Sequence, residues 1–457
     1  MNRTKTLAEI LKYSVIAILV LLPFHAVLTT WLGSNFGHLD AWRIWKELLI
    51  ALMVPGALYL VYRTHPKKDL GWVLRDERLR DWFRRNRLIA LILAYVALHL
   101  LLGGLALAGN RVNVTALIYA LLINLRFLVF FVLVMAIAAK TNLKTHWKKL
   151  LLWPALVVII FGLLQQFVLP PDFLRHFGYG PDTIPAVQTV DEKLEYRRVQ
   201  STLRGANPLG AYLLVVITAL AVLLIEARTI KKTATKIPPN TYYLLLTTTL
   251  LVLFLTYSRS AWLGTLLSLT ALGFWSLRRA RVRRWAALGA VIFTVTFGAT
   301  VWILRDNDRL QNTLFHSDET SQSSESSNTG RARALQTGLA DVIKEPFGRG
   351  PGTAGPASVR GDQPARIAEN YYLQIAQEVG LLGLALFVAI NIYVASALWQ
   401  RREDPLALIL LASLAGLTLI NILSHAWTDD TLSLIWWGLA GIALAPAIMQ
   451  RKGLQKK

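Results

Sequence analysis

The stretch VTALIYALLINLRFLVFFVLVMAIAA, residues 114–139, decides the fold class, because Arg126 is its only charged residue. The run exceeds the ~20 apolar residues that a transmembrane helix needs. Similar runs recur along the whole chain, which has 457 residues, is 54% hydrophobic and has a mean hydropathy of +0.44. A soluble protein of this size would be far more polar. The sequence therefore predicts an all-α, polytopic membrane protein.

About twelve such runs cross the bilayer in the predicted topology, within a single membrane domain that covers residues 1–457. The predicted spans are 13–32, 47–62, 88–108, 114–139, 150–169, 209–226, 242–257, 260–277, 286–304, 372–398, 406–424 and 431–449. The stretch 242–277 is divided into a helical hairpin at Tyr257-Ser258-Arg259-Ser260, because one unbroken helix would be far too long for a bilayer.

Lys and Arg residues indicate the orientation, because they are enriched in the cytoplasmic loops of membrane proteins. A cytoplasmic N-terminus places the basic segments 63–87 and 278–284 inside, together with the C-terminal tail. The net charge of +22 would indicate nucleic acid in a soluble protein, but here it follows from this bias and from attraction to anionic headgroups. We expect both termini in the cytoplasm, the lipid bilayer as a partner, and no nucleic acid.

Two long loops break the pattern of short connections, and both lie outside in this topology. The first long outer loop is 170–208, and the second, larger one is 305–371, before the tenth span. Long loops in compact proteins are usually functional or disordered. The second loop contains a predicted short amphipathic helix at the membrane surface, because apolar residues recur there at helical spacing. These residues are Leu335, Leu339, Val342 and Ile343.

Arginines at membrane-surface depth on the outer side are informative, because the positive-inside bias disfavours them there. Arg198 and Arg204 lie just before the sixth span, and Arg259 lies at the tip of the 257–260 hairpin. A phosphate is a natural partner, since guanidinium groups bind phosphate oxygens in bidentate fashion. The alternative is that these arginines snorkel to headgroups or pair with acidic residues of the same loops.

Four segments between about residues 195 and 390 resemble, in order and spacing, motifs of the O-antigen ligase and O-antigen polymerase superfamily. They are RVQSTLRGAN (198–207), TYSRSA (256–261), GRGPG (348–352) and ENYYLQIAQEVGLLG (369–383). Each motif alone is weak, but four in order on a matching topology are specific. The resemblance implies a GT-C-like fold and an inverting, metal-independent glycosyltransferase that needs no cofactor.

The resemblance also implies the substrates. The donor would be a glycan on undecaprenyl pyrophosphate, used at the outer face of the cytoplasmic membrane. The acceptor would be a lipid A-core sugar in a lipopolysaccharide ligase, the next repeat unit in a polymerase, or a protein hydroxyl in an oligosaccharyltransferase. Two arginines would stabilise the pyrophosphate leaving group, because its negative charge grows as the glycosidic bond breaks.

Residue by residue, the motifs predict catalytic roles for Arg198, Arg259 and Glu369. Family ligases have His immediately before the Asn of the loop, where this chain has Glu369. The Glu369 carboxylate could take the acceptor proton, or it could pair with Arg366 or an active-site arginine. This departure favours a polymerase or an outlying branch over a lipid A ligase. The predicted substrate-binding residues are Arg204, Asn207, Tyr257, Arg349, Asn370, Tyr372, His425 and Asp430; no metal ligand is predicted.

The turn SHAWTDD, residues 424–430, has two interpretations. Its His and Asp side chains could form an acid–base relay or bind sugar hydroxyls. Alternatively, Thr428 or Asp429 caps the last helix, and the tryptophans around it are interfacial anchors. These tryptophans are Trp427, Trp436 and Trp437. Arg126, in the middle of a span, requires a partner, and we expect a structural ion pair.

A lipid-linked oligosaccharide flippase or another transporter is the main rival function, since twelve spans fit it equally well. Transporters often have related halves and interrupted helices at mid-membrane. This chain has no evident half-to-half similarity, and its polar residues gather in outer loops. The sequence therefore favours the glycosyltransferase.

Overall fold

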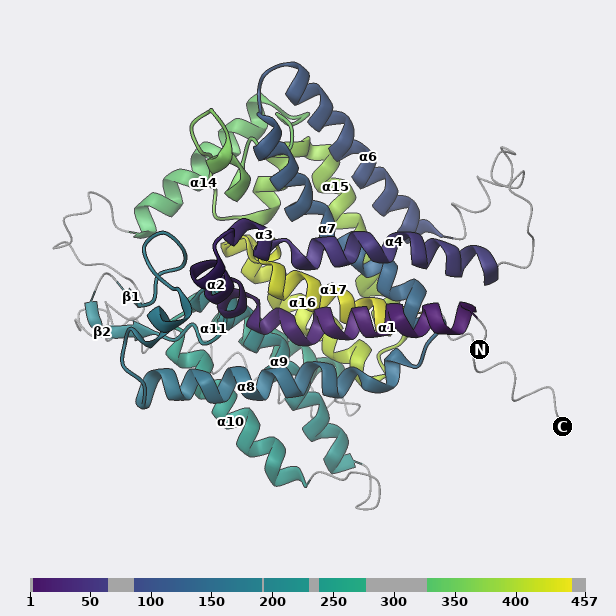
Figure 1. The fold of residues 1–457 in the computed structure, drawn as a ribbon, viewed down its shortest axis with the longest axis vertical. Coiled ribbons are helices and arrows are strands. Elements are labelled where there is room, and N and C mark those ends of the chain that lie inside the picture. The colour runs from purple at the N-terminus through teal and green to yellow at the C-terminus, as the bar shows by residue number, and fades with distance from the viewer. Residues whose placement is uncertain (1–2, 65–85, 191–192, 230–237, 277–326, 446–457) are drawn as a thin grey trace.

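The computed structural model describes residues 3–64, 86–190, 193–229, 238–276 and 327–445, and these residues are mostly helical (Figure 1). The α-helices are α1 (Arg3–Leu21), α2 (His25–Phe36), α3 (Leu39–Arg43), α4 (Trp45–Thr64), α6 (Arg87–Ala108), α7 (Val114–Ala138), α8 (Trp147–Phe167), α9 (Ala206–Thr229), α10 (Pro239–Leu255), α11 (Arg259–Ser276), α14 (Ser327–Lys344), α15 (Tyr371–Gln400), α16 (Pro405–Leu423) and α17 (Asp430–Leu444). Short 3-10 turns are η1 (Leu22–Phe24), η3 (Leu143–His146), η4 (Phe173–Phe177), η6 (Gly355–Arg360) and η7 (Ala426–Thr428). Strands β1 (Gln188–Val190) and β2 (Lys193–Arg198) pair antiparallel, with Gln188 opposite Arg198.

Where the structure describes them, the predicted spans fall on helices, although η1 interrupts the first span and a break at Val379 and Gly380 interrupts the tenth. Among the described residues, eight helical segments are long and apolar enough to cross a membrane, and α10 and α17 are shorter apolar helices. The predicted span 286–304 lies outside the described residues, so the count of twelve spans stays a prediction. The chain is therefore a multi-helix membrane protein.

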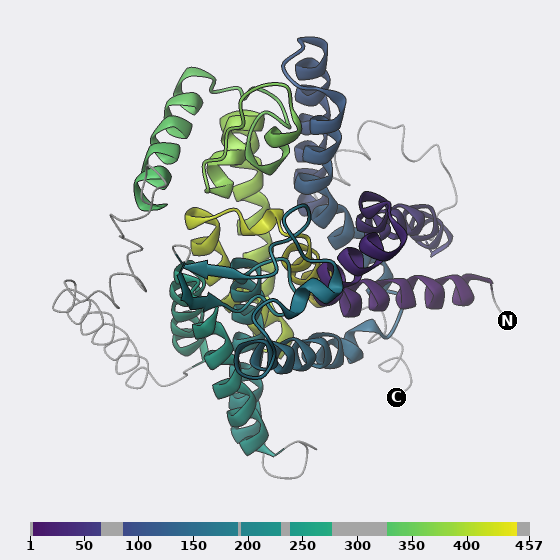
Figure 2. The same ribbon diagram turned by 60° about the vertical axis from the view of Figure 1, so that its left-hand side comes forward.

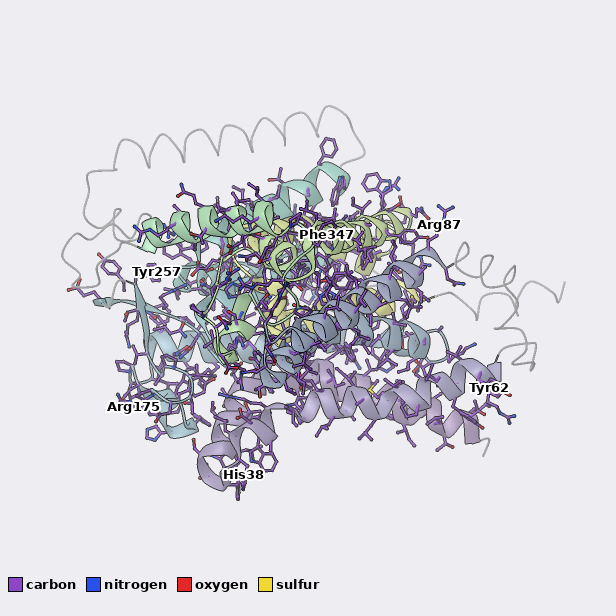
Figure 3. The ribbon with its side chains drawn as sticks, turned by 90° about the horizontal axis from the view of Figure 1, so that it is seen from above. His38, Tyr62, Arg87, Arg175, Tyr257 and Phe347 are labelled. Carbon is purple, nitrogen blue, oxygen red and sulfur yellow. The ribbon has the colours of Figure 1, made fainter. Side chains whose placement is uncertain are left out.

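Some residues that the predicted topology assigns to opposite sides of the membrane lie at opposite ends of the molecule (Figure 3). Tyr62 and Arg87, which flank the predicted cytoplasmic loop, lie at one end in Figure 3. Arg175 and Tyr257, which belong to predicted outer segments, lie at the opposite end. The pair β1–β2 likewise lies opposite the start of α1 (Figures 1 and 2). Which of these two sides faces the cytoplasm stays a prediction.

Helix α17 lies in the middle of the bundle, and this position overturns the interpretation of its tryptophans as interfacial anchors. The yellow helices α16 and α17 are central in both ribbon views (Figures 1 and 2). Trp427, Trp436 and Trp437 are fully buried. The Trp436 Nε1–H donates to Ser413 Oγ at 3.0 Å, and the Trp437 ring centroid lies 5.4 Å from that of Phe127. The interpretation was wrong because Trp427 and every residue of α17 are enclosed by protein.

The amphipathic helix predicted in the second long outer loop is present as α14, at the edge of the molecule in Figure 2. Val342 is buried in a small cluster with Leu373 and Ala376 of α15. The other apolar residues of the predicted face are exposed, with Ile343 at 79%. One edge of this face therefore packs on α15, and contact of the remainder with the membrane surface stays a prediction.

The glycine stretch 348–352 packs against a break in the middle of α15. The backbone leaves helical geometry at Val379 and at Gly380, where φ is +71°. The N–H groups of Arg349 and Gly350 donate to the carbonyl oxygens of Gln377 and Glu378, at 3.0 and 2.8 Å. Gly348 also has positive φ, and a Cβ there would lie 2.4 Å from the Gly380 nitrogen. The motif thus permits a backbone approach that no other residue type could make.

Arg126 is held in a buried ion network between α2, α4, α7 and α17. Its Nη1 lies 2.9 Å from Glu47 Oε1, which confirms the predicted structural pair. Lys46 Nζ lies 3.3 Å from Glu47 and 2.9 Å from Asp430 Oδ2. His25 Nε2 lies 3.2 Å from the same Asp430 oxygen, while its Nδ1 accepts from Trp45 Nε1. Two acidic and two basic side chains therefore balance one another inside the bundle.

Replacing Arg126 with methionine is expected to lower the free energy of unfolding by about 3 kcal/mol. The reason is that Glu47 would keep a buried charge after losing its guanidinium partner. Lys144→Met is the control, because the Lys144 side chain is 52% exposed in its ion pair with Asp404 and should contribute under about 1 kcal/mol. Thermal unfolding of both variants in detergent tests this, and equal losses would contradict it.

Candidate functional site

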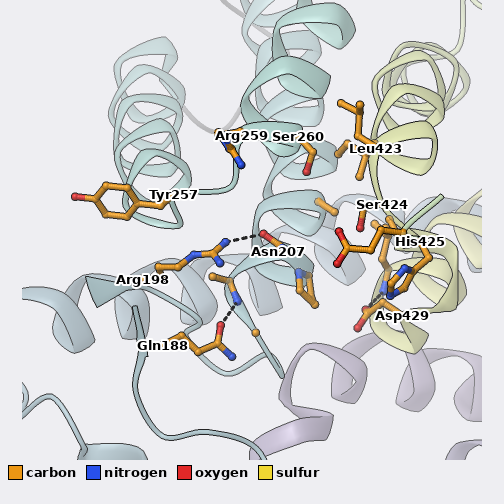
Figure 4. Close-up of a pocket in the computed structure, with 18 of the residues that line it drawn as sticks. Gln188, Arg198, Asn207, Tyr257, Arg259, Ser260, Leu423, Ser424, His425 and Asp429 are labelled. Atoms are coloured by element: carbon orange, nitrogen blue, oxygen red, sulfur yellow. Dashed lines mark hydrogen bonds between the residues drawn. The ribbon is translucent and has the colours of Figure 1, made fainter. Parts of the chain in front are cut away.

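A cavity of about 810 Å³ opens where the ends of several helices meet (Figure 4). The strand pair β1–β2, the start of α9, the turn between α10 and α11, the end of α16 and the turn before α17 contribute its walls. Its charged lining residues are Arg198, Arg204, Arg259, Glu369 and Asp429, with His425 beside them. The sequence segments that carry these groups are far apart, and the fold brings them to one space.

Arg198, at the end of β2, joins three of these segments. Its Nε donates to the Thr256 carbonyl at 2.9 Å, and its Nη2 donates to Asn207 Oδ1 at 2.6 Å (Figure 4). Thr256 precedes the α10–α11 turn, and Asn207 lies in the first turn of α9. The guanidinium is therefore held in a defined plane at the cavity wall, which limits the entropy that ligand binding would cost.

The tight turn between α10 and α11 places Arg259 beside Arg198. Tyr257 in this turn has φ +49°, a strained conformation for a bulky residue. Arg259 is the first residue of α11, and its guanidinium points down toward Arg198 and Asn207 in Figure 4, whereas the Tyr257 ring points away. Two guanidinium groups from different segments therefore share one side of the cavity.

Glu369 reaches the cavity from the start of α15. It is half-buried and has φ +48°, so it is a second strained residue in the lining. Asn370, the next residue, caps α15 by accepting the N–H of Leu373 at 3.0 Å. Arg366, one of the alternative partners predicted for Glu369, lies 3.3 Å from Asp341. Backbone strain of this kind is often concentrated at functional sites.

The turn before α17 contains both a helix cap and polar side chains at the cavity, which were the two interpretations of its sequence. Asp429 caps α17, because its Oδ1 accepts the N–H of Leu432 at 3.0 Å. Its Oδ2 lies 3.1 Å from Arg204 Nε at the cavity wall. Burial raises the pKa of Asp429, although Arg204 partly opposes the shift. His425 also lines the cavity (Figure 4), so the turn both caps a helix and contributes polar groups.

The sequence analysis predicted Asp430 as a substrate-binding residue, but the acidic residue of this turn that lines the cavity is Asp429. Asp430 is the first residue of α17, and its carboxylate pairs with Lys46 and His25 in the buried ion network. Adjacent residues at a helix start point in different directions, because the capping residue is extended and the next one is helical. The capping interpretation was the signal that could have identified Asp429.

Most of the other predicted site residues line the cavity, and some do not. Arg198, Arg204, Asn207, Tyr257, Arg259, Glu369 and His425 are in the lining. Arg349, Asn370 and Tyr372 are not: the Arg349 backbone binds the break in α15, Asn370 is a helix cap, and the Tyr372 ring lies 6.1 Å from that of Phe387. Gln188 was missed; its Oε1 accepts the N–H of Ala206 at 3.0 Å, next to Asn207.

Comparison with known proteins agrees with the predicted resemblance. Residues 244–388 match the family model Wzy_C, O-antigen ligase. The match covers the turn with Arg259, the glycine stretch 348–352 and the start of α15 with Glu369, whereas Arg198 and His425 lie outside it. The resemblance to the O-antigen ligase and polymerase superfamily is thereby confirmed. A search among curated proteins gave no match.

Proposed function

We propose that this protein, whose residues 244–388 match the O-antigen ligase family, transfers a glycan from undecaprenyl pyrophosphate to a hydroxyl acceptor. The reaction takes place at the outer face of the cytoplasmic membrane. The single observation that supports this most is that Arg198 and Arg259 share a cavity with the carboxylate of Glu369. Such a cavity offers cations for a leaving phosphate and a base for an incoming hydroxyl.

The proposed step is a direct displacement at the anomeric carbon. The acceptor oxygen forms a bond to this carbon while the bond to the pyrophosphate oxygen breaks, and the electron pair stays on the phosphate. Arg198 and Arg259 stabilise the growing negative charge, because guanidinium groups donate to two phosphate oxygens at once. Glu369 receives the proton of the acceptor hydroxyl. Attack opposite the leaving group inverts the anomeric configuration.

The lipid part of the donor fits the apolar edge of the same cavity. Leu263 of α11 and Leu423 of α16 line the cavity, and they are 45% and 41% exposed. We expect these apolar side chains to contact the polyprenyl chain, which can stay in the bilayer while its pyrophosphate reaches the arginines. Glu369 in place of the family His favours a repeat-unit acceptor over a lipid A-core acceptor.

Transfer by the purified protein tests the proposal. The protein is reconstituted in lipid nanodiscs with an undecaprenyl-pyrophosphate-linked glycan, with or without a glycan acceptor, in the presence of a metal chelator. We expect acceptor-dependent glycan products and release of undecaprenyl pyrophosphate. A protein that gives no product here, but moves the lipid-linked glycan across vesicle membranes, would instead be the transporter.

A further inference from the structure

Helix α15 contains a buried carboxylate that the proposed reaction does not use. Glu378 is fully buried. Its Oε1 accepts the N–H of Gly352 at 2.7 Å, and its Oε2 accepts from Asn124 Nδ2 of α7, also at 2.7 Å. One side chain therefore connects α15, the glycine stretch of the outer loop and α7. Burying a carboxylate is unfavourable unless its oxygens are hydrogen-bonded, so these two bonds are needed for it to remain there.

The position of Glu378 is special because α15 breaks immediately after it. The residues from Tyr371 to Glu378 form a short first segment, and the helix changes direction at Val379 and Gly380. A break of this kind leaves main-chain groups without their helical partners. The loop supplies replacements, since Leu381 donates its N–H to Pro346 O at 2.9 Å and Gly350 donates to Glu378 O at 2.8 Å.

This first segment of α15 sets the place of Glu369. Glu369 stands directly before the helix cap Asn370, so its location depends on the direction in which the segment points. The N–H of Tyr371 also donates to Ser424 O at 3.1 Å, which ties the start of the segment to the cavity wall. Its far end is tied at Glu378. A change at either end would displace the carboxylate of Glu369 from the cavity.

We propose that Glu378 is a positioning residue, whose hydrogen bonds to Gly352 and Asn124 hold the first segment of α15, and with it Glu369, at the cavity. The inference rests on the proposed function for the role of Glu369, but the placement itself does not. It explains why a carboxylate, rather than an apolar side chain of similar size, occupies the interior of this helix. In this role the Glu378 side chain must form hydrogen bonds, but it does not need to carry a negative charge.

Two substitutions separate hydrogen bonding from charge and from packing. Glu378→Met keeps the volume and removes both acceptors, so kcat for transfer should fall about 100-fold, as expected for a displaced reacting group. KM for the lipid-linked donor should stay within about twofold, because the arginines lie on other elements. Glu378→Gln should keep at least about half of the wild-type kcat, since its Oε1 can accept from Gly352 while its Nε2 donates to Asn124 after the Asn amide turns over.

A distance measurement that does not depend on activity completes the test. The sequence has no cysteine, so Ile367→Cys, which is two residues before Glu369 and 39% exposed, and Arg175→Cys can be spin-labelled specifically. Wild type and Glu378→Gln should give the same narrow distance distribution, and Glu378→Met a broad or shifted one. If wild type fails to transfer glycan, the proposed function is wrong, yet these distances still decide whether Glu378 holds the start of α15 in place.

The inference is overturned if Glu378→Met retains wild-type kcat and label distances, or if Glu378→Gln is as slow as Glu378→Met. The second result would mean that the charge itself is required. Should Glu378→Met fail to fold, Asn124→Leu removes only one of the two bonds and is expected to lower kcat about tenfold. Wild-type kcat and distances in folded Asn124→Leu would then contradict the proposed role of its bond to Glu378.

Discussion

Arg198→Ala and Arg259→Ala are each expected to lower the rate of glycan transfer by about 1,000-fold, a loss typical of removing one donor to a developing oxyanion. The effect should lie mainly in kcat, because the charge on the pyrophosphate is larger in the transition state than in the bound donor. Steady-state kinetics in nanodiscs, with release of undecaprenyl pyrophosphate as the readout, measures both parameters.

The two arginines should respond differently to lysine. Arg198 uses its Nε and Nη2 on Thr256 and Asn207, a planar geometry that an ammonium group cannot reproduce. Arg198→Lys should therefore remain nearly as slow as Arg198→Ala, whereas Arg259→Lys should recover more of the rate, provided that charge is its main contribution. Arg175→Ala is the matched control, since this arginine lies on the same side, is 71% exposed and pairs with Asp172. Full activity of both alanine variants would show that neither arginine takes part in glycan transfer.

Hydropathy and motif spacing predicted the part of the fold that depends on local sequence. Runs such as 114–139 are apolar throughout, so their helical state follows from the membrane environment alone. The motif segments around Arg198, Arg259 and Glu369 were expected to form one outer cavity, and these residues do line one. Their chemical roles stay proposals.

The predictions failed where the direction of a side chain, or the burial of a helix, depends on packing between segments that are far apart in the sequence. Asp429 and Asp430 are adjacent and chemically alike. Because of the geometry of the helix start, Asp429 pairs with Arg204 at the cavity and Asp430 pairs with Lys46. Trp436 and Trp437 are typical interface residues by composition, but the surrounding helices enclose α17 completely. The sequence also did not predict that the backbone of Arg349 binds the break in α15, because hydropathy does not indicate such a break.

Glu369→Gln is expected to lower kcat by about 1,000-fold if the carboxylate is the general base, within the range that such catalysis contributes. The substitution keeps the size of the side chain and the same φ of +48°, so the backbone strain should not change. Donor KM should be little affected, because the arginines that bind the pyrophosphate lie on other elements. Steady-state kinetics in nanodiscs measures both parameters.

Chemical rescue distinguishes a base from a structural carboxylate. Glu369→Gly tolerates positive φ and leaves space in a cavity of about 810 Å³, so added formate can enter and take the acceptor proton. Formate should accelerate Glu369→Gly but not Arg198→Ala. Glu345→Gln, on the same outer loop and 4.0 Å from Arg366, is the control and should keep wild-type kinetics. If Glu369→Gln retains the wild-type rate, the base must be sought among the other groups of the cavity, whose lining also includes His425 and Asp429.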